Sequence, residues 1–145
     1  MLTVIQRVTE ASVRIDEKVV GEIEGGLLIL CGFALEDNSD TLSKMLTKCL
    51  QYRIFSDNEG KMNLSLKKIE GGLLLVPQFT LMADTSRGLR PGFSRAAPPE
   101  QGKRLFAELI ELAKAMHPVV EYGVFGADMK VGLCNDGPVT FVMEF

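Results

Sequence analysis

The chain begins with alternating apolar and polar residues, the pattern of half-buried β-strands. Residues 11–15 alternate in this way, and the polar triplet 16–18 predicts a turn into a second strand over 19–23. After two glycines, residues 27–31 are continuously apolar, which indicates a strand buried on both faces. We therefore expect a hairpin followed by a central strand of a sheet.

Two later segments have the period of amphipathic helices. The first is predicted to start at a cap formed by Ser39 or Asp40, and the second at Pro98-Pro99. The second is expected to end at His117, because a proline follows it. We interpret both apolar stripes as faces of the core. The stripes are Leu42, Met45, Leu46, Cys49 and Leu50, and Leu105, Phe106, Leu109, Ile110, Ala113 and Met116.

The end of the chain predicts a pair of strands. Residues 129–133 and 139–145 both alternate, and residues 134–138 (CNDGP) between them are typical of a turn.

A short internal repeat links two of these regions. Residues 23–35 (IEGGLLILCGFAL) and 69–81 (IEGGLLLVPQFTL) are offset by 46 positions and share eight of thirteen residues. We expect two equivalent strands in one sheet, each followed by a helix on the same face. Where the first copy has Gly32-Phe33-Ala34, the second has Gln78-Phe79-Thr80. Ligands of open α/β sheets gather at the carboxyl ends of strands. Gln78 and Thr80 therefore mark a candidate site, although solvent-facing strand residues would look the same.

Composition and charge narrow the class of protein. The 145 residues suit one domain spanning 1–145, with 46% hydrophobic and 24% charged residues. A net charge of −3 argues against a protein that coats DNA or RNA. No apolar stretch is long enough to span a membrane, and Arg7 and Glu10 stand where a signal peptide would need an unbroken apolar core. Three distant cysteines, interpreted as small buried residues, fit a reducing cytoplasm.

Most familiar catalytic groupings are missing. His117 is the one histidine, and neither a zinc-binding spacing nor a phosphate-binding glycine loop occurs. We expect neither metal nor cofactor. An enzyme built from this chain would work by positioning and by hydrogen bonds aimed at developing charge.

One basic cluster stands out. Arg87, Arg90 and Arg95 lie in a glycine- and proline-rich loop, and Lys103-Arg104 follow soon after. Loop arginines suit phosphate, and only a few phosphates would be engaged. Composition alone favours a merely solvated loop.

Two motifs carry a resemblance to a known family. The segments 78–81 (QFTL) and 135–140 (NDGPVT) resemble the signature pair of the D-aminoacyl-tRNA deacylases. The resemblance extends over the whole chain. Its supporting segments are Gln6-Arg7-Val8, Tyr52-Arg53-Ile54-Phe55, the RGLRPGFS loop and Ala127-Asp128-Met129.

The resemblance implies a fold and an activity. We expect an α/β domain in three layers, with two helices over a mixed sheet and a small second sheet made by the terminal strands. It implies a homodimer that hydrolyses the ester joining a D-amino acid, or glycine, to the 3′-terminal adenosine of tRNA. Neither DNA nor a membrane is an expected partner.

The resemblance also assigns residues. Gly137-Pro138 would form a cis bond, reach into the other subunit's pocket and hold the substrate's amino group, so that an L side chain meets backbone. Arg7 would brace this loop; otherwise it is a surface strand charge. Phe125 and Met129 would pack around the adenosine; otherwise they are ordinary core residues.

For catalysis, the resemblance favours the 2′-hydroxyl of the tRNA as the assisting group, with backbone amides near Phe79 and Thr80 stabilising the oxyanion. The alternative is Thr80 as nucleophile, for which no activating base is evident. Pro77 stands where the family has serine, and it lacks both a hydroxyl and a backbone donor. We expect activity to survive this change and discrimination against small L-amino acids to be the property at risk.

Three alternatives have different consequences. A non-catalytic module for the tRNA 3′ end would bind without turnover. A structural dimer would use the Gly-Pro loop only at its interface. A general small-ester hydrolase would cleave free amino acid esters.

Overall fold

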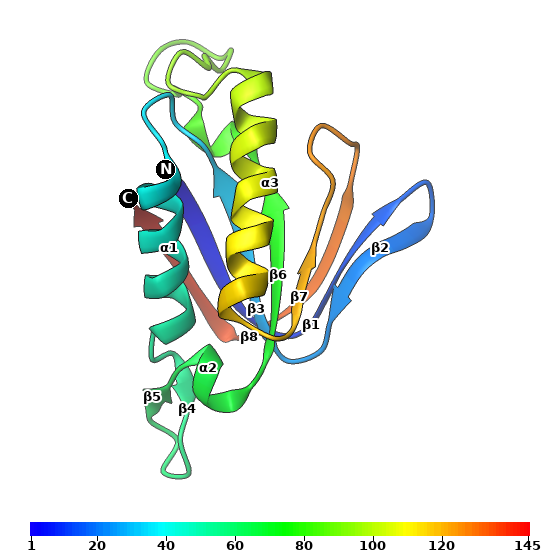
Figure 1. The fold of residues 1–145 in the computed structure, drawn as a ribbon, viewed down its shortest axis with the longest axis vertical. Helices are drawn as coiled ribbons and strands as arrows, with labels where there is room; N and C mark the ends of the chain where they lie inside the picture. Colours follow the sequence, from blue (N-terminus) through cyan, green and yellow to red (C-terminus); the bar gives the residue numbers. More distant parts are fainter.

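A computed structural model describes all residues from 1 to 145. Helices α1 (Ser39–Gln51) and α3 (Pro99–Met116) lie side by side over one face of a curved sheet (Figure 1). Two short helices, α2 (Leu66–Ile69) and the 3-10 helix η1 (Phe79–Met82), flank strand β6 along the chain. None of the helices has both the length and the apolar character needed to cross a bilayer. The strands are β1 (Leu2–Ile15), β2 (Lys18–Ile23), β3 (Gly26–Gly32), β4 (Phe55–Ser56), β5 (Met62–Leu64), β6 (Gly72–Pro77), β7 (Val120–Tyr122) and β8 (Lys130–Glu144).

The main sheet is mixed and nearly closed. Its order is β2-β1-β3-β6-β7, and β8 pairs with β1. The two edges of the sheet approach each other where Gly21 of β2 faces Tyr122 of β7. A Cβ atom on Gly21 would lie only 2.9 Å from the Tyr122 carbonyl oxygen. The predicted α/β class, mixed sheet and small second sheet are confirmed, but the second sheet consists of β4 and β5 and not of the terminal strands.

The repeat predicts the centre of this sheet correctly. Strands β3 and β6 pair in parallel from Gly26 opposite Gly72 to Cys31 opposite Pro77, at the constant offset of 46. Each is followed by a long helix, α1 or α3, on the same face (Figure 1). Both strands are buried on both faces, as their continuous apolar runs predict.

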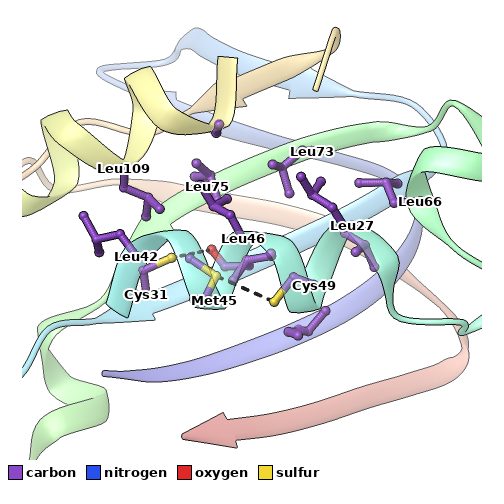
Figure 2. Packing of buried hydrophobic residues seen from close by; sticks show 14 of the residues in the cluster. Leu27, Cys31, Leu42, Met45, Leu46, Cys49, Leu66, Leu73, Leu75 and Leu109 are labelled. Atoms are coloured by element: carbon purple, nitrogen blue, oxygen red, sulfur yellow. Dashed lines mark hydrogen bonds between the residues drawn. The ribbon is translucent and has the colours of Figure 1, made fainter. Parts of the chain in front are cut away.

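Two hydrophobic clusters lie on the two faces of β3 and β6. Leu27 and Leu75 point toward the helices and pack with the stripe of α1 and with Leu109 of α3 (Figure 2). Leu28 and Leu74 point the other way, into a smaller cluster with residues of β1 and β2. The predicted stripe of α1 is fully buried, which confirms its assignment to the core.

The local predictions hold with one shift. The β1–β2 hairpin turns at Asp16 and Glu17, whose φ angles are 46° and 64°. Helix α3 starts at Pro99 and is capped at its end by His117, as expected. The prediction of Ser39 or Asp40 as the N-cap of α1 is wrong. The N-cap is the preceding residue, Asn38, whose side chain accepts hydrogen bonds from the backbone amides of Asp40 and Thr41. Its extended backbone lets the side chain turn back onto those amides.

The predicted strand pair at the end of the chain is wrong. Strand β8 runs on in one direction through residues 134–138 and pairs with β1 on both sides of them. Between the pairs Val8–Asn135 and Gln6–Thr140, β1 advances by two residues and β8 by five. The extra residues bulge outward instead of reversing the chain. The small second sheet is accordingly β4–β5, and the terminal strands belong to the main sheet. Pairing with the long β1 overrides the local turn preference.

The cysteines divide into two kinds. Cys31 and Cys49 are buried, as predicted, and burial raises the pKa of both thiols, that of Cys49 to about 12. Cys134 is exposed, contrary to the prediction, and lies in β8 beside the exposed Gly132 and Leu133.

Candidate functional site

The end of β6 forms the first part of the site. Pro77 is the last residue of the strand, and the backbone amide of Gln78 donates to the Cys31 carbonyl at 2.7 Å. The chain then turns into η1. This turn sits directly on Gly32 of β3, where a Cβ atom would lie 2.9 Å from Leu81 Cβ and 3.2 Å from the Gln78 carbonyl oxygen. Gly32, in the first copy of the repeat, therefore leaves space for residues 78–81 at the end of the second copy.

An apolar cavity of about 550 Å³ opens beside this turn. Its size falls within the roughly 300–1,000 Å³ of small-molecule sites. Phe79 is 55% exposed, and its ring packs against Phe93 with centroids 5.0 Å apart. Phe125 lies against helix α3, where a Cβ atom on Gly102 would be 2.9 Å from its ring. The lining residues are Pro77, Phe79, Phe93, Ala96, Ala97, Pro98, Pro99, Phe125 and Gly126.

Met129 lies behind this cavity. Its sulfur accepts from the backbone amide of Val124 at 3.3 Å, and a Cβ atom on Gly123 would be 2.6 Å from the same sulfur. That position is also 3.5 Å from Cδ of Pro77. Met129 therefore supports the wall of the cavity through Gly123 without lining it.

The polar groups at the strand end include no base. The Gln78 amide donates to the Thr80 hydroxyl, and both side chains lie at the surface end of β6. The Nε2 atom of His117 lies 2.7 Å from the carbonyl oxygen of Gly71, just before β6 begins. Six residues of strand, about 20 Å, separate that end from Gln78. His117 therefore cannot activate Thr80. No group of three or more His, Cys, Asp or Glu side chains is arranged to hold a metal ion.

The second part of the candidate site is a braced loop, residues 135–138, which we call the Gly-Pro loop. The Arg7 side chain is 10% exposed; its Nε donates to the Asp136 carbonyl at 3.1 Å and lies 3.2 Å from the Asp136 carboxylate. Its Nη1 donates to the Ile54 carbonyl at 2.7 Å. Arg7 is thus a buried strut, not a surface charge.

The loop itself stands out from the sheet. Gly137 and Pro138 are exposed, their peptide bond is cis, and Gly137 has a φ of 125°. Asn135 ties the base of the loop, because its Oδ1 accepts from the Val139 amide at 3.2 Å and its Nδ2 donates to the Thr140 hydroxyl at 2.8 Å. Hydrogen bonds from Arg7 and Asn135 thus hold the base of the loop, while Gly137 and Pro138 at its tip are exposed.

The two parts lie at opposite ends of the sheet. Arg7 pairs with Leu27 in β3, five residues, or about 16 Å, before the level of Gln78. Figure 1 shows β8 bending at the bottom of the view, while β3 and β6 end at the top. One chain therefore brings together Pro77, Gln78, Phe79, Thr80 and Phe125. It does not bring Arg7, Gly137 or Pro138 to them.

Sequence reasoning missed part of the cavity wall. Phe93 lies in the basic loop and Ala96-Ala97 follow it. We singled out this loop for its charge and as part of the resemblance, and not as a cavity wall. Pro98 and Pro99 were interpreted only as the start of a helix, and they also line the cavity. The available signal was Phe93, an aromatic residue between Gly92 and Ser94 in a glycine- and proline-rich loop.

Comparisons with known proteins agree along the whole chain. A family model described as D-Tyr-tRNA(Tyr) deacylase matches residues 4–144. A protein of Legionella pneumophila (strain Corby) named D-aminoacyl-tRNA deacylase is 61% identical over 145 residues, covering 100% of both chains. One of the same name from Teredinibacter turnerae is 56% identical over 144 residues, covering 99% of each.

Solved structures share the fold. One described as c-Myc DNA Unwinding Element Binding Protein has a TM-score of 0.95 at 36% identity, covering 100% of this chain and 99% of its own. Another, described as a probable eukaryotic D-amino acid tRNA deacylase, has a TM-score of 0.85 at 17% identity over 98% of this chain and 97% of its own. The second likeness concerns the fold alone.

Proposed function

This chain belongs to the family of D-aminoacyl-tRNA deacylases, and we propose that it hydrolyses the ester bond between a D-amino acid and the 3′-terminal adenosine of a tRNA. The products are the free D-amino acid and the tRNA. The observation that carries the proposal within the structure is the apolar cavity beside Gln78-Phe79-Thr80, at a strand end without a side-chain base.

The cavity suits a nucleobase. Its walls are aromatic rings and prolines, and base–aromatic stacking contributes about 1–3 kcal/mol per base. In the proposed complex the adenine lies between Phe79 and Phe125. The ribose and its ester then lie over the turn that leaves β6.

The turn from β6 into η1 can also stabilise the negative charge that develops on the ester carbonyl oxygen during hydrolysis. Phe79 and Thr80 begin η1, and the first backbone amides of a helix have no acceptor within it. We propose that these amides donate to the oxyanion of the tetrahedral intermediate. Such donors are effective because they are already oriented when the charge appears.

The nucleophile in this proposal is water, assisted by the tRNA. Water adds to the ester carbonyl carbon, and the bond from that carbon to the ribose oxygen then breaks. The neighbouring 2′-hydroxyl orients the water and relays its proton to the departing ribose oxygen. Thr80 is not needed as nucleophile, because its hydroxyl accepts from Gln78 and no group is placed to take its proton.

Selection for D-amino acids is assigned to the Gly-Pro loop of a second copy. The loop and the strand end lie at opposite ends of one chain, which supports the proposal that a homodimer completes the site. The carbonyl oxygens of Gly137 and Pro138 would accept from the substrate ammonium group, and an L side chain would run into backbone. A glycyl group, as on a mischarged tRNA(Ala), has no side chain to be excluded. The bracing by Arg7 and Asn135 supports this role, because exclusion requires a loop that does not yield.

The direct test is deacylation of matched D-tyrosyl-tRNA and L-tyrosyl-tRNA by the purified protein with EDTA present. We expect release of the D-amino acid only, and strongly slowed release from a D-tyrosyl-tRNA whose terminal adenosine lacks the 2′-hydroxyl. Binding without release would indicate the non-catalytic module. Cleavage of D-tyrosine ethyl ester at a comparable rate would indicate a general esterase.

A mixing experiment tests the shared site. Phe79→Asp removes the strand-end half and Gly137→Val removes the loop half, since valine cannot adopt a φ of 125°. Each variant alone should be inactive. After subunit exchange, half of the dimers are mixed and each holds one intact site, so about a quarter of wild-type activity should return. No recovery from a mixture shown to have exchanged would place the whole site in one subunit.

A further inference from the structure

The mouth of the cavity carries positive charge that hydrolysis itself does not use. Residues 85–104 contain five lysines and arginines and one acidic residue, whereas the rest of the chain contains eleven basic and eighteen acidic residues. We use the term basic rim for three exposed members of this segment: Arg87, Arg90 and Lys103.

The fold holds the basic rim against the cavity. The loop is closed by two backbone hydrogen bonds between Asp84 and Gly92, of 2.7 and 3.1 Å, and Arg87 and Arg90 lie in the part that these bonds enclose. The next residue, Phe93, lines the cavity and contacts the ring of Phe79.

The third member, Lys103, is close to the cavity along helix α3. Arg95 is not counted, because it lines a separate hollow together with Glu144. Lys103 lies one helical turn after Pro99, another lining residue, and so on the same side of α3.

The charge of the basic rim is only partly neutralised. Arg87, Arg90 and Lys103 form no ion pair. Asp84, the acidic residue at the base of the loop, is engaged by Ser86, whose hydroxyl and amide donate to it at 2.6 and 2.9 Å. These hydrogen bonds, the hydroxyl first, lower the pKa of Asp84, so its carboxylate stays ionised and offsets one charge of the loop. The remaining positive charge of the basic rim is available to an anion.

We infer that the basic rim binds phosphates of the tRNA 3′ strand that leads out of the cavity. The inference rests on the proposed function, because an adenosine in the cavity places the preceding phosphodiesters at its mouth. The arginine fork pairs with phosphate oxygens through two parallel hydrogen bonds. Such contacts read neither the bases nor the amino acid, so they suit an enzyme that accepts many tRNAs.

The test compares Arg87→Ala/Arg90→Ala with Lys67→Ala/Lys68→Ala, which removes the same charge from α2 at the other end of the molecule (Figure 1). Binding of uncharged tRNA is measured by fluorescence anisotropy from 50 to 200 mM salt. Each contact to a single strand contributes about 0.7 to the logarithmic salt slope. The loop variant lacks two such contacts, and the salt concentration rises fourfold. The ratio of the wild-type to the variant affinity for tRNA should therefore fall about sevenfold across this range. The α2 variant should behave like wild type.

Hydrolysis provides the second measurement. On D-tyrosyl-tRNA the loop variant should have a raised KM and an unchanged kcat. On D-tyrosyl-adenosine, which has no phosphate, it should match wild type. Equal tRNA affinities and salt slopes would overturn the inference, and so would an equal loss on D-tyrosyl-adenosine. If wild type binds tRNA through the rim yet hydrolyses neither substrate, the inference stands and the proposed hydrolysis fails.

Discussion

The two copies of the internal repeat run side by side as β3 and β6, yet their ends have opposite surroundings. In the first copy Phe33 is 4% exposed, packs edge-on against Phe106, and accepts a hydrogen bond from the Ala97 amide at its carbonyl. In the second copy the equivalent Phe79 is 55% exposed and borders a cavity.

The difference comes from what crosses each strand end. The segment that follows the basic loop pairs with the end of the first copy, where Ala34 and Ala96 form a bridge, and so closes it. It only borders the end of the second copy. The two copies of the repeat therefore form equivalent strands. The segment that covers the end of β3 makes that end part of the core, and the end of β6, which it does not cover, borders the cavity.

Replacing Phe33 with alanine should have the largest effect and should fall on stability. Loss of a buried phenylalanine costs about 3–5 kcal/mol in the free energy of unfolding. Urea denaturation measures this loss, and activity per folded molecule should remain. If Phe79→Ala, its matched control, were equally destabilising, the two strand ends would not differ in the way described.

Replacing Gly32 with alanine should affect both ends at once. The added Cβ would meet Leu81 and the Gln78 carbonyl, so we expect a loss of about 1–3 kcal/mol and slower hydrolysis as the turn shifts. Gly25→Ala is the control, since its Cβ would have only one neighbour, 3.9 Å away. Unchanged activity in Gly32→Ala would show that the position of η1 does not matter for catalysis.

Replacing Phe79 with alanine should affect binding alone. We expect the free energy of unfolding to stay within about 0.5 kcal/mol of wild type, because the ring is exposed. The KM for D-tyrosyl-tRNA should rise about tenfold through loss of base stacking. Phe79→Tyr should restore it. Steady-state kinetics measure this KM, and an unchanged value would show that the adenine does not stack on Phe79.

Replacing Thr80 with alanine should have the smallest effect. A neutral hydrogen bond contributes about 1 kcal/mol, so kcat should fall by no more than about fivefold. Thr80→Ser, which keeps the hydroxyl, is the matched variant. Complete loss of hydrolysis by a folded Thr80→Ala protein, with activity kept by the serine variant, would return Thr80 to the role of nucleophile.

Much of the scaffold could be predicted from the sequence. The 46-residue offset of the repeat predicts the register of β3 and β6, and the apolar periods predict α1 and α3, because these patterns report which faces are buried. The resemblance pointed to residues 78–80 and 137–138 before any contact was known. The path of β8 could not be predicted, because pairing with a strand more than a hundred residues away outweighs the turn preference of residues 134–138.

The sequence by itself determined the class of fold, the central strands and the segments that carry candidate chemistry. These depend on local periodicity and on residue identity. Only the tertiary structure decided that Arg7 is a buried strut, that Phe93 and two prolines complete a cavity, and that the Gly-Pro loop lies far from the strand end of its own chain. Each of these facts depends on contacts between segments distant in sequence, and such contacts follow from how strands and loops cover one another.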